Sequence, residues 1–577
     1  MTENRRVKSY QARIDAAEMA RARTHPDHVA NGDEQAFAHA NYAMSFTKGL
    51  PHDPATGLIG DARDFEAFRS AIDAGFIDAF NYNVPVATAC TTRRRWEAPT
   101  AGITYDLQGP DAQAVTMDPA PAMGSDELAY EMAEVYELAL IRDEPLTALQ
   151  AGAGNGAVQA SAARLNGFAY RPASGTGRPR KTDAAGDVTE QTLFRGSGVG
   201  ATEGPYLSQF MLIGTADQAG ADSVADGRIT YGVNQIDQRV PVAETTDWMI
   251  NRADWLEVQQ GCDVRDNATL FSNAARRFIT TPRDMASYVH DDALYQAYLN
   301  ACLILLGMGT PFDPGFGALS GSGGLFTQRA SGAHGEFARQ AGGFALYGGP
   351  HILTLVTEVA TRALKAVRFQ KFNTHIRLRP EALAGRIEYA AEIEAAFPGV
   401  GSQFADMEAA IQPTVDAVRA VTGNALLPMA FQEGSPMHPS YGAGHATVAG
   451  ACVTVLKAYF DTTTQFVRRG ATEAFVRREI GDVPLAYTAD ATGAALVADT
   501  AGPFLTLEGE LNKLAANISI ARNMGGVHFY TDYHDSLRMG EEIAIGMLEE
   551  QALCYPTDPF VLTVPTFDGG TRRIGAR

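Results

Sequence analysis

Apolar residues recur at helical spacing along much of this chain, and the longest such pattern begins near residue 350. In the segment HILTLVTEVATRALKAVRFQKFNTHIRLR, from His351 to Arg379, apolar side chains stand three and four residues apart, which predicts an amphipathic helix. Proline lacks the backbone N–H that a helix interior needs, so Pro380 is expected to end this helix. The pattern therefore predicts one long helix that stops at Pro380.

Shorter patterns predict further helices on both sides of this one. Residues 170–245 are rich in Gly, Thr and Asp and hold few periodic runs. The final stretch, FVLTVPTFDGGTRRI, predicts a hairpin that turns at Asp568-Gly569. The additional predicted helices cover about 125–152, 285–307, 403–422, 444–461, 506–522 and 530–553.

These elements predict a mainly α fold, with helical bundles and a few short β-hairpins. At 577 residues the chain is long enough for roughly three or four domain-sized units, and it shows no internal repeat. We divide it into a loop-rich, mostly helical region at 1–345 and a C-terminal helical bundle at 346–577. Both are expected to pack as one compact unit, with the chemistry in the second.

Charge and hydropathy exclude several classes of partner. Asp and Glu number 67 against 47 Lys and Arg, which gives a net charge of −20 and disfavours nucleic acid and anionic membranes. The N-terminus, MTENRRVKSYQARIDAAEMARAR, is charged and helical in pattern, without the apolar core of a signal peptide. The most apolar stretch, at 301–309, is too short to cross a bilayer. A soluble protein is expected, cytoplasmic by default, with export by another route left open.

Cysteine usage favours a reducing compartment. The five cysteines are widely spaced, odd in number and without a CxxC pair. Free or buried thiols are therefore expected in preference to a disulfide framework. The residues concerned are Cys90, Cys262, Cys302, Cys452 and Cys554.

Against this acidic background, one face of the predicted long helix is basic. At about 100° per residue, Arg368, Lys371, His375 and Arg379 fall within an arc of about 80°. A stripe of this kind is most often a solvated surface. Here the other face and the flanking sequence are apolar and the protein is acidic, which favours a buried anion pocket.

The stretch HPSYGAGHATVAGAC, at 438–452, supplies a second part of the same chemistry. A glycine loop that runs into an apolar, Ala-rich helix leaves backbone N–H groups unpaired at the helix N-terminus, where the helix dipole also favours an anion. Gly444 stands at this turn, and His438 and His445 flank the loop. A histidine next to a bound anion is suited to act as its acid or base.

A third part is the stretch ARNMGGVHFYTD, at 521–532. On a continuous helix Arg522 and His528 would lie on different faces, but the glycine pair at 525–526 breaks the path and lets both converge. Asp532 follows His528 by four residues, the spacing at which a carboxylate fixes the tautomer of an imidazole. Each histidine taken singly is more often a core residue, but the three stretches together predict an oxyanion cage.

The three stretches resemble a signature shared by vanadium-dependent haloperoxidases and the type 2 phosphatidic-acid-phosphatase-like acid phosphatases. That signature is Lys…Arg-Pro, then Ser-Gly-His, then Arg-x5-His-x3-Asp. Seven residues separate Lys371 from Arg379, as in the bromoperoxidase branch of algae and cyanobacteria, whereas the phosphatase pattern has six. The resemblance to that branch covers nearly the whole chain, from HVANGDE at 28–34 and SFTKGLPHD at 45–53 to the FDGG hairpin.

The resemblance implies a vanadate cofactor and a set of residues that hold it. It implies that Lys371, Arg379 and Arg522 hydrogen-bond the vanadate oxygens, together with the backbone N–H of Gly444. His528 resembles the axial ligand, which binds vanadium through a ring nitrogen.

The resemblance implies roles for four more residues. His445 resembles the acid/base histidine that handles protons when peroxide binds, and His438 stands where the bromoperoxidase branch has a histidine that tunes this step. Arg368 lies three residues before Lys371, at the position where algal members have a residue near the halide pocket. Asp532 would support the ligand histidine from behind.

Two departures from the family pattern change these expectations. Ala443 replaces the serine of Ser-Gly-His, so one charge-assisted hydrogen bond is lost, which would weaken vanadate binding by roughly 1.5–3 kcal/mol. Red-algal relatives carry an acidic calcium loop upstream of the cage helix, but residues 315–343 here contain Glu336 as their sole carboxylate. Calcium needs several hard oxygen donors, so no calcium is predicted.

The resemblance implies a haloperoxidase that uses hydrogen peroxide to oxidise bromide, and iodide more easily still, to a hypohalous acid that halogenates small organic acceptors. Family members commonly form homo-oligomers, so a homo-oligomer is expected. Two alternatives stay open. One is a phosphatase, with His528 as nucleophile and Asp532 orienting it, because vanadate and phosphate are both tetrahedral oxyanions. The other is a non-catalytic oxyanion-binding or assembly protein.

Overall fold

The structure is a computed structural model that describes residues 4–150, 155–172, 177–215, 223–315, 319, 343–555, 558 and 560–575. The segment 315–343, on which the calcium prediction rests, lies outside the described residues except at 315, 319 and 343. No helix in the described ranges is both long enough and apolar enough to cross a membrane.

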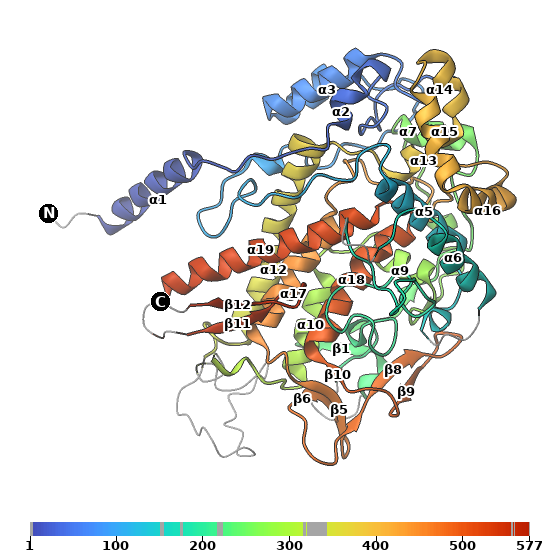
Figure 1. The fold of residues 1–577 in the computed structure, drawn as a ribbon. Coiled ribbons are helices and arrows are strands. Elements are labelled where there is room, and N and C mark those ends of the chain that lie inside the picture. Colours follow the sequence, from blue (N-terminus) through green and yellow to red (C-terminus); the bar gives the residue numbers. More distant parts are fainter. Residues whose placement is uncertain are drawn as a thin grey trace.

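The fold is mainly helical, as predicted, and is built around one buried helix (Figure 1). Helix α17 (Gly444–Tyr459) is buried along its whole length except at His445. It packs against α12 (Gly349–Phe369), α18 (Leu507–Met524) and α19 (Tyr530–Cys554). A helix that is apolar on all sides is stable only when other helices surround it, which explains its central place.

The N-terminal half packs onto this centre. Helix α5 (Asp126–Leu140) and helix α9 (Pro282–Tyr288) contact α18, and α10 (Gln296–Gly307) contacts α12 and α17. The division of the chain near residue 345 stays a prediction. Further helices are α1 (Arg5–Arg21), α2 (Asp33–Ala36), α3 (Ala62–Ala74), α4 (Ile77–Asn83), α6 (Gly156–Asn166), α7 (Arg252–Gln259), α8 (Asn267–Leu270) and α14 (Ala390–Ala396).

Strands form short antiparallel pairs at the periphery. The predicted C-terminal hairpin is confirmed as β11 (Leu562–Pro565) with β12 (Thr571–Ile574), and Gly569 in its turn has φ of 79°. In the largest sheet β5 pairs with β6, β7 and β10. The strands are β1 (Arg228–Tyr231), β2 (Asn234–Asp237), β3 (Val240–Pro241), β4 (Arg276–Arg277), β5 (Gln465–Arg469), β6 (Thr472–Val476), β7 (Val483–Pro484), β8 (Ala486–Ala489), β9 (Leu496–Asp499) and β10 (Leu505–Thr506).

The prediction of one helix that runs to Pro380 is wrong. Helix α12 ends at Phe369, residues 370–375 widen into a π-helical turn, and Ile376 takes the left-handed conformation with φ of 41°. Arg379 is extended, as expected for a residue before proline, and Pro380 begins the next helix, α13 (Pro380–Glu388). Arg379 therefore does not share a helical face with the basic residues before it.

Three other predicted helices are each interrupted. The segment 285–307 contains the end of α9 and then α10, with no helix over 289–295. The segment 125–152 contains α5 and then a separate 3-10 turn at Leu146–Leu149, after Pro145. The segment 403–422 contains α15 (Gly401–Ala410) and α16 (Gln412–Thr422), and the second of these has a proline in its first turn. In the segments 125–152 and 403–422 a proline precedes or opens the second helical piece, because proline lacks the backbone N–H that a helix interior needs.

The expectation of five free thiols is wrong for one pair. Cys90 and Cys262 form a disulfide across 172 residues of sequence, whereas Cys302 and Cys452 are buried free thiols and Cys554 is an exposed one. Backbone hydrogen bonds between 92–94 and 261–263 hold the two segments side by side. The pairing depends on this long-range contact, so cysteine spacing gave no sign of it.

Candidate active site

A cavity of about 260 Å³ lies at the N-terminus of the central helix α17. The first backbone N–H groups of a helix have no partner within the helix, and Gly444 is the first residue of α17. Side chains from α12, from the last turn of α18 and from the loop after it face the same space. The cavity brings together six predicted site residues, Arg368, His438, Gly444, His445, Arg522 and His528.

Arg379 joins two histidines behind this cavity. Its Nη1 donates to Nε2 of His528 at 3.0 Å, and its Nη2 donates to Nδ1 of His438 at 2.8 Å. It also donates from Nε to the carbonyl of His438 and from Nη1 to the carbonyl of Val527. All three side chains are buried. Helix α12 ends at Phe369 and the chain turns at Ile376, and this turn directs Arg379 toward the two histidines.

The tautomer of His528 is fixed from both sides. A guanidinium can only donate, so Nε2 accepts from Arg379, and Nδ1–H donates to Asp532 at 2.7 Å. Burial and the positive charge of Arg379 hold the pKa of His528 well below its usual value. The ring is therefore neutral; its Nε2 lone pair accepts from Arg379, and His528 lines the cavity.

Asp532 is held as a carboxylate by several donors. Besides His528, its oxygens accept from Arg377 Nη1 at 2.9 Å, from the backbone N–H of Phe529 at 3.0 Å, and from the hydroxyl of Ser440. Burial opposes ionisation, but the hydrogen bond from His528 and the charge of Arg377 keep the pKa of Asp532 well below its usual range. The hydroxyl of Ser440, the serine nearest to Ala443, is thereby engaged with Asp532.

A second histidine–carboxylate pair faces the cavity from α17. Nε2 of His445 lies 2.9 Å from Oδ1 of Asp292, and both residues line the cavity. Although burial opposes ionisation of Asp292, the neighbouring His445 holds its pKa below the usual value. Because a carboxylate only accepts, Nε2 carries the proton and Nδ1 is left as the proton-accepting nitrogen.

Lys371 holds the loop that carries the histidines. Its ammonium donates to the carbonyls of Pro439 at 2.7 Å, Ser440 at 2.9 Å and Gly442. An ammonium has three donors, so all are engaged. Lys371 is fully buried and, like Arg379, stands behind the residues that line the cavity. Burial and the charges of Arg379 and Arg368 lower its pKa.

Two arginines that line the cavity have donors without a partner. Within the described part of the chain, Nε of Arg522 and Nη1 of Arg368 are buried and have no hydrogen-bond partner. Arg522 otherwise donates to the carbonyl of Val289. Leaving such donors unsatisfied is costly, so both favour an anion in the cavity.

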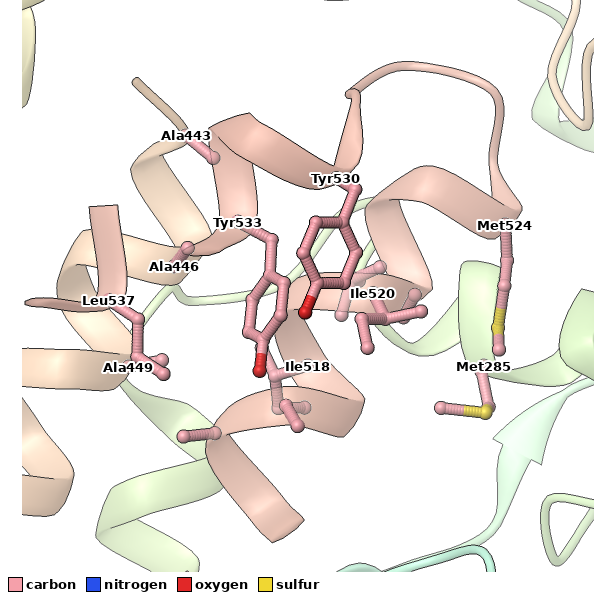
Figure 2. Close-up of a cluster of buried hydrophobic side chains, with 14 of the residues drawn as sticks. Met285, Ala443, Ala446, Ala449, Ile518, Ile520, Met524, Tyr530, Tyr533 and Leu537 are labelled. Carbon is pink, nitrogen blue, oxygen red and sulfur yellow. The ribbon is translucent and has the colours of Figure 1, made fainter. Parts of the chain in front are cut away.

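Ala443 faces a different environment from its neighbour Gly444. Figure 2 shows Ala443 in the buried apolar cluster that also contains Ala446, Tyr533 and Leu537. Ala443 is 2% exposed and is not among the residues that line the cavity. It is the N-cap residue of α17, where it makes no side-chain hydrogen bond.

Several residues of this site were missed in the sequence, among them three that contact predicted site residues. Arg377 stands between Lys371 and Arg379, so the basic motif itself could have pointed to it. Asp292 lies 153 residues before His445, and no local pattern links the two. Glu97 lines the cavity 3.5 Å from His438 and gave no signal in the sequence either.

The arrangement is suited to an oxyanion and not to a cation. Four arginines and a helix N-terminus line the cavity, and Lys371 and Arg379 stand behind it; these groups favour a negatively charged ligand. Among the described residues, no group of three or more His, Cys, Asp or Glu side chains could hold a metal cation. The neutral imidazole of His528 lines the same cavity, and its Nε2 lone pair is open to a ligand that displaces Arg379.

Comparisons with known proteins agree with this interpretation. A family model described as the VCPO second helical-bundle domain matches residues 406–553. The chain is 39% identical over 625 residues to a vanadium-dependent bromoperoxidase of Corallina officinalis, with 99% of each chain covered. It is 32% identical over 525 residues to a vanadium-dependent bromoperoxidase of Ascophyllum nodosum, covering 89% of this chain and 83% of that one.

A solved structure is similar over the whole fold. It is the homohexameric second vanadate-dependent bromoperoxidase of Ascophyllum nodosum, with a TM-score of 0.75 and 25% sequence identity. The match covers 100% of this chain and 91% of that one. The helical architecture described above is thus shared with that structure.

Proposed function

The chain belongs to the family of vanadium-dependent bromoperoxidases, and we propose that the cavity at the N-terminus of α17 is its vanadate site. The residues present fit a tetrahedral oxyanion. The buried Nε of Arg522 has no partner among the described residues, and His528, whose Nε2 now accepts from Arg379, lines the same cavity. A Lewis-acidic oxyanion would satisfy both kinds of group at once.

Five residues would hold the cofactor. Arg379, Arg522 and Lys371 would supply charge and hydrogen bonds to its oxygens, the backbone N–H of Gly444 would add a further donor, and Nε2 of His528 would supply the metal ligand. Lys371 now donates to three carbonyls, so it would contact the oxyanion by exchanging one of them. Its charge acts on the site in either arrangement, because the surroundings are buried.

The reaction is the oxidation of a halide by hydrogen peroxide. Peroxide, bromide and one proton give hypobromous acid and water, and the acid halogenates an organic acceptor. Bound vanadate supplies the Lewis acid that makes peroxide open to attack by the halide. His445, with Nε2–H held by Asp292, takes and returns protons at Nδ1 as peroxide enters and water leaves.

Two residues act on peroxide and halide. His438 accepts from Arg379 at Nδ1, so its Nε2 carries the proton and lies 3.5 Å from Glu97 among the residues that line the cavity; we assign to it the preference for bromide and iodide over chloride. Arg368 lines the same cavity with a partnerless Nη1 and is the residue we assign to the halide.

The observation that carries this proposal is the contact of Arg379 with both His528 and His438 at one cavity. The test is bromination of monochlorodimedone by vanadate-free protein with peroxide and bromide, before and after orthovanadate is added. A rate that appears with orthovanadate supports the proposal, and a rate independent of it contradicts the proposal. Hydrolysis of p-nitrophenyl phosphate by the vanadate-free protein would instead favour the phosphatase alternative.

The proposal includes self-association. Helix α1 extends away from the body of the molecule (Figure 1), and of its residues just Ala20 is buried. Val7, Tyr10 and Met19 are 62%, 70% and 72% exposed. The helix carries five basic and two acidic residues on a chain of net charge −20, so it fits the acidic body of a second copy. Elemental analysis of the protein tests the accompanying proposal that no calcium is bound.

A further inference from the structure

Glu97 stands at the rim of the cavity on a segment whose backbone is fixed. Its N–H donates to the carbonyl of Met437 at 3.0 Å, and the indole N–H of the preceding Trp96 donates to the carbonyl of Lys48 at 3.0 Å. Upstream, the disulfide between Cys90 and Cys262 ties this segment to a second one at the rim. The position of Glu97 is therefore set by the fold.

The carboxylate of Glu97, by contrast, is not held by a hydrogen bond. It lies 3.8 Å from Arg94 Nη2, 3.8 Å from Arg368 Nη2 and 3.5 Å from His438 Nε2. No hydrogen bond joins it to another side chain within the described residues, and it is 43% exposed. Contacts of this length and exposure are loose and easily exchanged for an anion or water.

The neighbours of Glu97 differ in how many other partners they have. Arg94 also donates to the carbonyls of Glu433 and Ser435, at 3.1 and 3.0 Å. Arg368 is 12% exposed, its Nη1 has no partner among the described residues, and Glu97 is the carboxylate with which it forms its described ion pair. Burial lowers the pKa of Arg368 to about 10, and the charge of Glu97 opposes this shift. Arg368 is thus a buried cation with an incomplete counter-ion.

We propose that Glu97 sets the halide affinity of the cavity by competing with the halide for Arg368. A halide that approaches Arg368 meets the negative charge of Glu97, and it either displaces the carboxylate or binds against its repulsion. The inference rests on the proposed function, in which Arg368 receives the halide, and it adds the group that limits this binding. Glu97 acts through Arg368 and is therefore a positioning residue.

The negative charge of Glu97 reaches further than its contacts. It acts on Lys371, Arg379 and Arg522 as well as on Arg368; burial lowers the pKa of each of these groups, and the charge of Glu97 opposes that lowering. Removing the charge would leave the cation-rich cavity more attractive to any monovalent anion. The effect is expected on halide affinity in general and less on the choice between bromide and iodide, because both carry the same charge.

The test is the substitution Glu97→Gln in the vanadate-loaded enzyme. The KM for bromide is expected to fall by about two- to fivefold, the range that an exposed ion pair supports, with a smaller change in kcat. Glu97→Asp keeps the charge and should keep KM close to that of the unmodified protein. Loss of a merely structural contact would raise KM in both variants, so the direction of the change separates the two roles.

Two further variants make the test specific. In an Arg368→Gln background, Glu97→Gln should lower KM by a smaller factor than in the unmodified protein, because the cation for which both anions compete is gone and just the charge effect on the other cations remains. Asp291→Asn removes a carboxylate from the same cavity, and Asp291 has no ion pair with Arg368 among those described. Its effect on KM should be smaller than that of Glu97→Gln.

Halide binding can also be measured without turnover. The NMR line width of bromide, titrated with vanadate-free protein, should increase more for Glu97→Gln than for the unmodified protein and less for Arg368→Gln. An unchanged or raised KM together with unchanged line broadening in Glu97→Gln would overturn the inference. Absence of vanadate-dependent bromination in the unmodified protein would overturn the proposed function instead, while the line widths still decide the role of Glu97.

Discussion

Nη1 of Arg379 lies 3.0 Å from Nε2 of His528, the nitrogen that our proposal assigns to vanadium. Both groups are buried, and the guanidinium can only donate. A ligand that takes the Nε2 lone pair must therefore break this hydrogen bond, and doing so frees an Arg379 donor at the same place. One exchange thus yields a metal ligand and a hydrogen bond to the oxyanion together.

The first prediction concerns Asp532, which keeps the proton of His528 on Nδ1. In Asp532→Asn the amide can donate to Nδ1 and stabilise the other tautomer, which protonates Nε2. Vanadate affinity, read from the orthovanadate dependence of bromination, is expected to fall by about 10- to 100-fold. Asp535→Asn on the same helix is the control, because Asp535 binds Arg178 and Tyr441 away from the cavity. An equal loss in both variants would point to damaged folding.

Much of this site could be predicted because its residues are close in sequence. His528 and Asp532 are one helical turn apart, and Gly444 and His445 begin a helix whose apolar sequence is easy to recognise. Their spacing alone determines which groups meet, as with the confirmed C-terminal hairpin at 560–574.

The remaining contacts depend on long-range packing. Arg379 was assigned to a helical face, but it reaches His528 because the helix ends ten residues earlier and the chain turns at Ile376. Asp292 meets His445 from another part of the fold. Helical periodicity indicates which residues are neighbours on one helix. It does not indicate where the chain turns or which distant loop packs against that helix.

The disulfide between Cys90 and Cys262 supports the rim of the cavity. It closes a loop with a sequence separation of 172 residues, and Arg94 and Arg265 extend from the joined segments to the cavity. Replacing both cysteines by serine is expected to lower the free energy of unfolding by about 2–5 kcal/mol. Chemical unfolding with and without reductant measures this. The double variant should be insensitive to reductant, and a response equal to that of the unmodified protein would contradict the prediction.

Acid should destabilise the protein through buried neutral histidines, of which His52 is the clearest. Burial, aided by the charge of Arg386, lowers the pKa of His52 to about 3. Its Nδ1–H donates to the carbonyl of Leu50 at 2.8 Å, and the hydroxyl of Thr47 donates to Nε2 at 3.2 Å. Both ring nitrogens of His52 thus have a hydrogen-bond partner when the ring is neutral.

The direction of the effect follows from proton binding. The unfolded chain takes up a proton at His52 below about pH 6.5 and the folded chain does not, so this stability is present above pH 6.5 and lost as pH falls toward 3. His52 alone should contribute a loss of about 2 kcal/mol between pH 6.5 and 5. Unfolding of His52→Gln by urea should show a slope with pH that is shallower by this amount. The exposed His39→Gln is the control and should keep the slope of the unmodified protein.

Removal of residues 1–22 tests the role of α1 in self-association. If the exposed apolar side chains and basic residues of α1 bind a second copy, the truncated protein should have a lower mass by light scattering. Because just Ala20 of α1 is buried, the fold itself should persist, with unchanged far-UV helicity per residue of the remainder. Reversal of charge at Arg5 and Arg6 should weaken association more at low than at high salt. An unchanged mass in both variants would contradict the proposed surface.

The last prediction concerns Ala443, where the family pattern has serine. Ala443 caps α17 without a side-chain hydrogen bond and lies in the apolar cluster of Figure 2. In Ala443→Ser the hydroxyl can accept from a first-turn N–H, which should raise the free energy of unfolding by about 0.5–2 kcal/mol. Ala449→Ser, inside the same helix and cluster, buries a hydroxyl without a cap to form and should be destabilising.

The properties of Ala443→Ser also show whether the new hydroxyl caps α17 or faces the cavity. A serine that caps α17 competes with the oxyanion for a first-turn N–H group, so vanadate affinity should stay the same or fall while thermal stability rises. A hydroxyl that turned to the cavity would instead strengthen vanadate binding by roughly 1.5–3 kcal/mol, or about 10- to 100-fold, without the gain in stability. Because Ala443 does not line the cavity, we expect the first outcome. Thermal unfolding of the vanadate-free variant and an orthovanadate titration of its bromination rate separate the two.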